Sequence, residues 1–260
     1  ADFERKTGTT FSDYRLRYGQ SAQSLRPDEH QLRFVDVPTT KIHAKFRTEY
    51  VYRPEWGSIT PFLDVSAAHL EDNRNFYRLD RLGASTPEFG ALPSTTAALL
   101  QTLDTPNSYD SRHNSLDGTL GARCTIWLGG KLPNQHITFT PTVNGSIERL
   151  TYRRDALHAH PRRNQLFFLP TLSWGFDNCH IIYRMHAAYP ELLNLLDYTD
   201  NADPLNLYYG NPHLQRSTTH KVTFSRSWWK WKEGKKFFID VTWDVTRNAV
   251  AHGQTYDAAT

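Results

Sequence analysis

Residues 115–128 read SLDGTLGARCTIWL, and apolar and polar side chains alternate along this stretch. The apolar set is Leu116, Leu120, Ala122, Cys124, Ile126 and Leu128. The polar set is Ser115, Asp117, Thr119, Arg123 and Thr125. Because successive side chains of a β-strand point to opposite sides, the pattern predicts a strand with one apolar face and one polar face.

The same alternation recurs along the chain and predicts an all-β fold. It is strong at 136–148 and at 236–246. Weaker versions occupy 41–53, 59–69, 164–176, 179–189 and 218–229, and two further strands are expected at 11–19 and 31–37. Helical periodicity is nearly absent, and only residues 95–103 are expected to form a short helix. By the alternation criterion we expect roughly nine or ten strands.

The expected strands are long, and the connections between them alternate in length. Globular strands usually have about 5–6 residues, whereas ~9–11 residues cross a bilayer at a tilt. The short connections are 54–58, 129–134, 177–178 and 230–235, and the long ones are 70–112, 153–163 and 190–217. Outer-membrane barrels have tight periplasmic turns and long extracellular loops. We therefore expect residues 1–260 to be part of one transmembrane antiparallel up-and-down β-barrel of a bacterial outer membrane.

The composition excludes several other classes. Charged residues make up 22% of the chain, the mean hydropathy is −0.62, and no apolar run is long enough for a membrane helix. The aromatic content of 13% fits the aromatic girdles of membrane barrels. A net charge of +3 without a basic stripe does not indicate nucleic-acid binding. The chain starts at Ala1 without a leader, so we expect a removed signal peptide or a start inside a longer protein.

The two cysteines, Cys124 and Cys179, lie in no metal-binding spacing. No structural zinc site and no cofactor are therefore expected. We interpret both cysteines as buried free thiols, with a disulfide between them as the alternative.

A family resemblance comes from residues 192–209, which read LLNLLDYTDNADPLNLYY and are followed by GNPHLQ at 210–215. This segment resembles the "DPLN…GNP-x-L" segment in the barrels of TonB-dependent receptors, particularly the Bacteroidetes-type outer-membrane receptors. Residues 173–190 resemble the hairpin before that segment, and residues 246–260 resemble the stretch after it. The recognisable part covers roughly residues 110–260, while the N-terminal third matches only in texture.

The chain departs from the family pattern where Gln215 and Arg216 replace the usual Pro-Glu, and no plug domain, TonB box or terminal aromatic strand is found. The resemblance implies an incomplete portion of a barrel of about 22 strands. It implies uptake of an unknown small nutrient, energised by a TonB-type protein acting through a plug absent from these residues. Outer-membrane lipid would be the other partner, and no enzymatic activity is implied.

Two loops supply the candidate ligand-binding residues. These are His158, His160, Arg162, Arg163, Tyr208, Tyr209 and Asn211. A pair of imidazoles can bind a metal and arginines attract anions, but no third metal ligand is near, so a solvated polar loop is the simpler interpretation of 158–163. For Gly210-Asn211-Pro212 the simpler interpretation is a turn, because Gly and Asn tolerate positive φ and Pro fixes the bend.

Three tryptophans near residue 230 are expected to anchor the protein at a membrane interface. Trp228, Trp229 and Trp231 alternate with lysines at the end of an expected strand. Indole rings prefer the interface, and lysines extend from there to head groups. Single-stranded nucleic acid is the alternative ligand for such a pattern.

Two other functions remain open at this stage. The first is a soluble all-β carbohydrate-binding or adhesion module that uses exposed Trp and Tyr. The second is an outer-membrane lipid hydrolase, for which Ser173, His180 and His186 are the nominal residues, although no Gly-x-Ser-x-Gly motif is present. Asp240, Thr242 and Asp244 share a polar strand face and are expected to line a lumen rather than to act as acids or bases.

Overall fold

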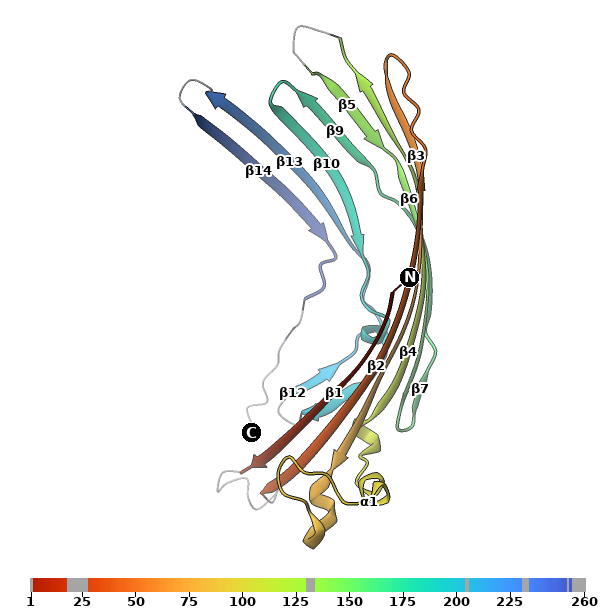
Figure 1. Cartoon of the computed structure of the whole chain (residues 1–260), viewed down its shortest axis with the longest axis vertical. Coiled ribbons are helices and arrows are strands. Elements are labelled where there is room, and N and C mark those ends of the chain that lie inside the picture. The colour runs from red at the N-terminus through yellow and green to blue at the C-terminus, as the bar shows by residue number, and fades with distance from the viewer. Residues whose placement is uncertain are drawn as a thin grey trace.

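The computed structural model describes residues 2–17, 28–129, 134–203, 206–230, 234–251 and 253. Its main element is a 12-stranded antiparallel sheet, and β11 and β12 pair as a separate two-stranded sheet. The all-β prediction is confirmed. Figure 1 shows the main sheet bent into one curved wall, and β1 and β14 form its two open edges.

The main sheet contains β1 (Asp2–Leu16), β2 (Glu29–Glu49), β3 (Gly57–Arg78), β4 (Tyr109–Trp127), β5 (His136–Thr140), β6 (Thr142–Arg154), β7 (Leu157–Ala159), β8 (Arg162–Phe168), β9 (Thr171–Phe176), β10 (Cys179–Ala188), β13 (Ser217–Lys230) and β14 (Lys235–Arg247). The small sheet contains β11 (Thr199–Asp203) and β12 (Asn206–Tyr209). The helical elements are η1 (Leu79–Ser85), α1 (Thr96–Gln101), η2 (Thr105–Asn107) and η3 (Leu193–Leu195). Among the described residues, no helix has the length and apolar character needed to span a membrane.

The twelve strands of the wall form nine passes, because β5 and β6 belong to one pass, β7, β8 and β9 belong to another, and prolines lie between the strands within each of these two passes. The order along the sheet is β1-β2-β3-β4-β5-β9-β10-β13-β14, with β6 and β8 continuing β5 and β9 on the same pairing register. Pro141 separates β5 from β6, and Pro170 separates β8 from β9. Proline has no N–H to donate to a ladder. Pro61, on β3, is opposite Ala122, whose N–H donates to the carbonyl of Pro141.

The connections are sorted by end, as the alternation of loop lengths predicted, with one exception. The β2–β3, β4–β5, β9–β10 and β13–β14 connections lie at one end of the wall, and the longer ones lie at the other (Figure 1). The prediction of a long loop over residues 153–163 is wrong. Arg154 pairs directly with Leu157, so the chain reverses in a two-residue turn in which Asp155 has φ 48°. A short polar side chain tolerates this left-handed conformation, which lets the strand continue.

The register gathers the apolar side chains of the wall on one face. Leu120, for example, is opposite Leu63 on one side and Val143 on the other. The exposed large apolar residues that share this face, named here the apolar belt, are Phe3, Ile42, Phe46, Leu63, Leu116, Leu120, Ile126, Ile137, Phe139, Val143, Ile147, Leu166, Phe168, Leu172, Trp174, Trp228, Phe237, Ile239, Val241, Trp243 and Val245. The other face is mainly polar and includes Asp240, Thr242 and Asp244, and its exposed large apolar side chains are Trp127, Trp229 and Phe238 near the short connections.

The apolar belt ends partway along the strands. Beyond Leu116, the same face of β4 and β3 carries Arg112 and Glu71, which form an ion pair at 3.1 Å. His69 and Asn114 are hydrogen-bonded beside them at 2.7 Å. The strands therefore extend past the belt into a section that is polar on this face.

Two small cores lie at the end with the long connections. The first contains Leu32, Phe34, Tyr77 and Leu79, with Leu99 and Leu103 of the α1 region packed against them. Thr95 caps α1 by accepting a hydrogen bond from the Ala98 N–H at 3.2 Å, which confirms the short helix expected over 95–103. Both cysteines are free, with Cys179 buried and Cys124 half-buried. The second core fixes the segment between β10 and β13 and is described below.

We predict that Leu79→Ala loosens the 79–108 connection. Leu79 is fully buried, and removing a buried leucine side chain costs about 2–5 kcal/mol. Hydrogen exchange over residues 79–108 should accelerate by at least tenfold. Leu100→Ala, at an exposed position of α1, is the control and should leave the exchange almost unchanged. Equal rates in the two variants would show that the first core does not hold this connection.

Candidate functional site

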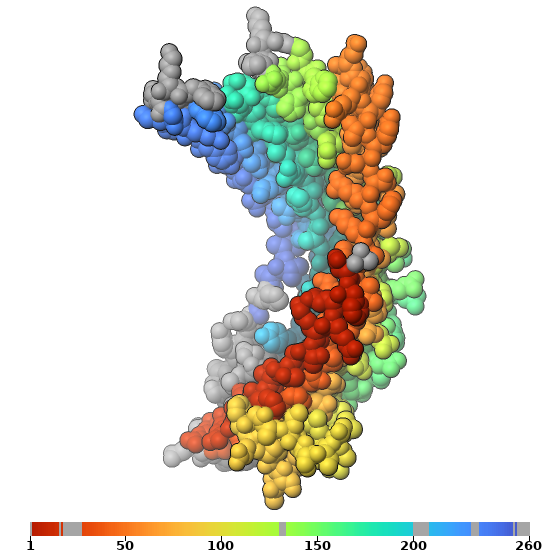
Figure 2. Space-filling view, viewed as in Figure 1, coloured from red at the N-terminus to blue at the C-terminus, as the bar shows by residue number. Residues whose placement is uncertain are grey.

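The connection between β10 and β13, residues 189–216, folds onto the polar face of the wall. Leu150 and Tyr152 of β6 form the second core with Leu192 and Leu196, and Tyr152 is 1% exposed. Leu150 and Tyr152 share the face of Ser146 because residues an even number apart in a strand point to one side. Figure 1 shows this connection on the concave side of the wall. The polar face is therefore the concave face, and Figure 2 shows the hollow that it borders.

Arg163 fastens the start of this connection. Its guanidinium lies 2.7 Å from Glu148 Oε2 and donates to the Pro190 carbonyl at 2.6 Å. The same group lies over the ring of Tyr189, 5.1 Å from its centroid. Both Arg163 and Glu148 are mostly shielded from solvent, with side-chain exposures of 14% and 15%. One of the residues predicted to bind a ligand is thus committed to holding the 189–216 connection in place.

The Gly210-Asn211 turn locks the other end of the connection onto η3. Gly210 N–H donates to the Tyr198 carbonyl at 3.0 Å, and a Cβ at Gly210 would lie only 1.8 Å from the Leu196 carbonyl oxygen. Asn211 N–H donates to Asn194 O at 2.7 Å, and its side-chain oxygen accepts from His213 N at 2.9 Å. Asn211 therefore makes backbone and side-chain contacts within this turn, and neither it nor Gly210 has the positive φ on which the simpler interpretation was based.

Tyr208 and Tyr209 are presented to solvent on this fixed connection. They lie on β12 and pair with Asp200 and Thr199 of β11. Their exposures are 63% and 69%. In Figure 1 β12 lies on the concave side of the wall. Of the residues nominated on 189–216, these two tyrosines present the large aromatic side chains to solvent, and Asn211 is exposed as well.

Of the remaining nominated residues, His158, Arg162 and Arg163 lie on strands rather than on a loop, and His160 is exposed between β7 and β8. His158 is opposite Arg153, and Arg162 is opposite Arg149, both on the face that carries the apolar belt but beyond its end. Arg163 points to the other face, so the structure separates residues that the sequence placed in one group. In the part of the chain that the structure describes, no group of three potential metal ligands occurs.

Buried polar contacts that the sequence did not indicate hold this end of the sheet together. Arg154 donates to the Pro106 carbonyl at 2.6 Å, which ties β6 to η2. Tyr109, beyond the apolar belt, donates to Asp72 at 3.3 Å. Burial, together with the charge of Asp72, raises the pKa of Tyr109 to about 12, so this phenol stays a neutral donor at physiological pH. Both contacts join residues far apart in the chain, which no local pattern reports.

The tryptophan pair at the end of β13 divides between the two faces. Trp228 lies on the belt face opposite Phe237, with the Arg226 guanidinium 4.5 Å from its ring centroid. Trp229 lies on the polar face, with Lys236 Nζ 5.9 Å from its ring centroid. Trp231 lies outside the described residues. Trp228 and Trp229 are beside the short β13–β14 connection, at the end opposite the 189–216 connection.

The nominal hydrolase residues lie on the polar face and are not direct partners of one another. Ser173 is opposite Ile182, while His180 is opposite Gly175 and His186 is opposite Thr219. No hydrogen bond joins the Ser173 hydroxyl to either histidine in the described part of the chain.

Comparisons with known proteins add no relative. No model of a known protein family matches the chain, and no curated protein sequence matches it. The resemblance to TonB-dependent receptors therefore stays a prediction from the motif at 203–214.

We predict that Arg163→Ala releases the 189–216 connection from the wall. The substitution leaves Glu148 shielded without its main cation, which costs up to about 3–5 kcal/mol. Proteolysis and hydrogen exchange over residues 189–198 should both accelerate by more than tenfold. Arg162→Ala removes the neighbouring exposed charge and serves as the matched control. If both variants behave alike, the Arg163 contacts do not hold the connection.

Proposed function

We propose that this chain is part of the barrel of a bacterial outer-membrane nutrient receptor of the TonB-dependent type. The observation that carries the proposal is the apolar belt, which extends over most strands of the wall on a face that no second layer of the described residues covers. Large continuous apolar patches are rare on proteins surrounded by water. A lipid-facing apolar side and a polar inner side are the pattern of membrane barrels.

The length of the belt supports a bilayer as its surroundings. On β4 it extends from Leu116 to Ile126, close to the ~9–11 residues that cross a membrane at a tilt. The ion pair between Arg112 and Glu71 lies beyond it, where side chains on the same face would meet water. The end with long connections would then be extracellular, and Trp228 would lie at the periplasmic interface.

The direction of the edge strands supports an incomplete arc of a larger barrel. All pairings along the nine passes are antiparallel, so β1 and β14 run in the same direction (Figure 1). If a barrel were closed by copies of this arc related by rotation about the barrel axis, β14 of one copy would meet β1 of the next in a parallel pair. An antiparallel barrel therefore needs an odd number of additional strands, and a total of about 22 would require about 13. Outer-membrane barrels with even strand numbers meet this condition.

The ligand would meet the exposed tyrosines of the concave side. Tyr208 and Tyr209 stand on a connection that Arg163 and Gly210 hold against the polar face. Aromatic side chains on a fixed backbone provide contact area at low entropic cost. Energy for uptake would come from a TonB-type protein acting through a plug that is not among residues 1–260.

A lipid-quenching experiment tests the membrane assignment. Leu120→Trp places an indole on the apolar belt, and Thr119→Trp places one on the polar face beside it. In vesicles of brominated lipid, the fluorescence from position 120 should be quenched at least twofold more than that from position 119. Both variants need a tryptophan-free background, or subtraction of the parent signal.

Three outcomes would contradict the proposal. Equal quenching at positions 119 and 120 would remove the lipid-facing belt. A protein that is folded and monomeric without detergent would favour the soluble all-β binding module. Ester hydrolysis in detergent micelles that survives purification would favour the lipid hydrolase.

We predict that Tyr208→Ala and Tyr209→Ala each weaken ligand binding by about 5–30-fold, since truncating an aromatic contact residue commonly costs about 1–2 kcal/mol. The measurement is the affinity for the best binder in a panel of oligosaccharides and short peptides. Tyr52→Ala, exposed at the opposite end of the wall, is the control and should bind as the parent does. Unchanged affinity in both tyrosine variants would move the ligand site elsewhere.

A further inference from the structure

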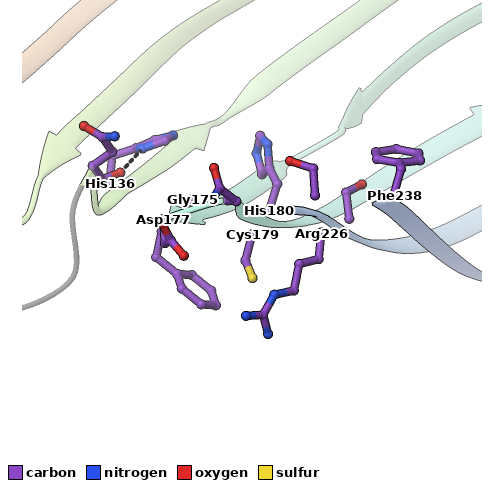
Figure 3. Close-up of a pocket in the computed structure, with 12 residues that line it drawn as sticks. His136, Gly175, Asp177, Cys179, His180, Arg226 and Phe238 are labelled. Atoms are coloured by element: carbon purple, nitrogen blue, oxygen red, sulfur yellow. Dashed lines mark hydrogen bonds between the residues drawn. The ribbon is translucent and has the colours of Figure 1, made fainter. Parts of the chain in front are cut away.

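A row of polar-face residues crosses five neighbouring strands near the short-connection end. His136, Gly175, His180, Ser225 and Asp240 are successive direct partners on β5, β9, β10, β13 and β14. Direct partners share a face of a sheet. Figure 3 shows the rings of His136 and His180 on the same side of the strands, with Cys179 and Arg226 on the other. All four of these residues border an open pocket of about 370 Å³.

The hydrogen bond of His136 fixes which ring nitrogen is free. Its Nδ1 lies 3.0 Å from the Asn134 carbonyl oxygen (Figure 3). A carbonyl only accepts, so Nδ1 carries the proton and the lone pair is on Nε2. Histidines that bind a metal through one ring nitrogen are commonly oriented in this way, by a hydrogen bond from the opposite ring nitrogen to a backbone carbonyl.

Gly175 allows the two rings to approach across an intervening strand. A Cβ at position 175 would lie 2.3 Å from Cε1 and 2.7 Å from Nε2 of His136. The His136 ring therefore lies directly over the glycine, with its Nε2 edge above strand β9. Its centroid is 6.2 Å from that of His180, and the ring planes are at 74°. Any side chain at position 175 would fill the space that the His136 ring occupies.

His180 supplies the second, independent observation. Its Nε2 is shielded from solvent and has no hydrogen-bond partner. A shielded polar atom without a partner costs about 1–3 kcal/mol, so a ligand that pairs with it gains that contribution. The other polar side chains of the row are already engaged, because Ser225 donates to Asp240.

We propose that His136 and His180 form a two-imidazole binding site for a divalent transition metal such as Cu²⁺, Ni²⁺ or Zn²⁺. Imidazole nitrogens suit these metals, and two metal–nitrogen bonds of about 2.0–2.1 Å can bridge rings whose centroids are 6.2 Å apart when both nitrogens turn toward the metal from opposite sides. Water would complete the coordination. The site has fewer protein ligands than a structural zinc site, so the metal exchanges with solvent. The inference does not depend on nutrient uptake.

The test is a Cu²⁺ titration of the purified protein in detergent, followed by calorimetry and by electron paramagnetic resonance. The parent should bind one equivalent with a spectrum that shows two nitrogen ligands. His136→Ala and His180→Ala should each lower the affinity at least tenfold and leave one nitrogen. Gly175→Ala should lower it by about 10–100-fold, because the added Cβ displaces the His136 ring that the Asn134 carbonyl orients.

His186→Ala is the matched control. This imidazole is exposed on the same face of β10, and its removal should leave affinity and spectrum unchanged. Near-ultraviolet circular dichroism and the thermal midpoint report whether each variant keeps its fold. Parent-like Cu²⁺ binding by a folded His136→Ala or His180→Ala variant would overturn the proposal, as would an absence of two-nitrogen coordination in the parent.

Discussion

The pairing register of nine antiparallel strand passes is the constraint on which the rest of the structure depends. Side chains alternate between the faces of a strand, so a shift of one residue would move every apolar side chain of that strand to the polar face. The register instead runs unbroken through the interruptions at Pro141 and Pro170. As a result a single apolar belt lies on one face. The concave face carries the polar side chains, including Arg163 and Glu148, that hold the 189–216 connection.

A single curved sheet has little room for an ordinary core. Apart from Phe76 and Cys179, its buried apolar residues lie in two small clusters at the end with the long connections. Individual polar contacts therefore do much to fix the connections at that end. Arg163 joins Glu148 and the Pro190 carbonyl, and Gly210 permits a backbone contact that a Cβ would block. These contacts set where Tyr208 and Tyr209 stand, which links the local packing to the proposed ligand site.

The sequence predicted the parts of the fold that depend on local pattern. Alternation located the strands and assigned their faces, as for residues 115–128 within β4. The alternation predicted that β3 ends near residue 69, whereas the strand continues to Arg78. Beyond the apolar belt both faces become polar, so the alternation is no longer visible in the sequence. The two strands expected at 31–37 and 41–53 are one strand, β2, for a similar reason.

The candidate site was predicted less well because it depends on contacts between distant residues. The turn at Asp155 carries no glycine to mark it, so His158, His160 and Arg162 were placed on a loop. The inward folding of 189–216 depends on Leu192 and Leu196 meeting Leu150 and Tyr152 across about forty positions of chain, a distance that periodicity does not report. The row from His136 to Asp240 likewise appears only once five strands are aligned.

Three of the prolines in the wall, Pro61, Pro141 and Pro170, have a mechanical consequence, because the register places them in one transverse line. Pro61 is opposite Ala122, and the continuing registers place Pro141 opposite both Ala122 and Pro170. Pro170 accepts a hydrogen bond from Met185 N–H, yet neither it nor the other two prolines can donate one in return. Adjacent strands therefore lack N–H donors at the same level of the sheet, which weakens the hydrogen-bond ladder there. Bending of the wall would concentrate along this line, between the histidine row at one end and the tyrosines at the other.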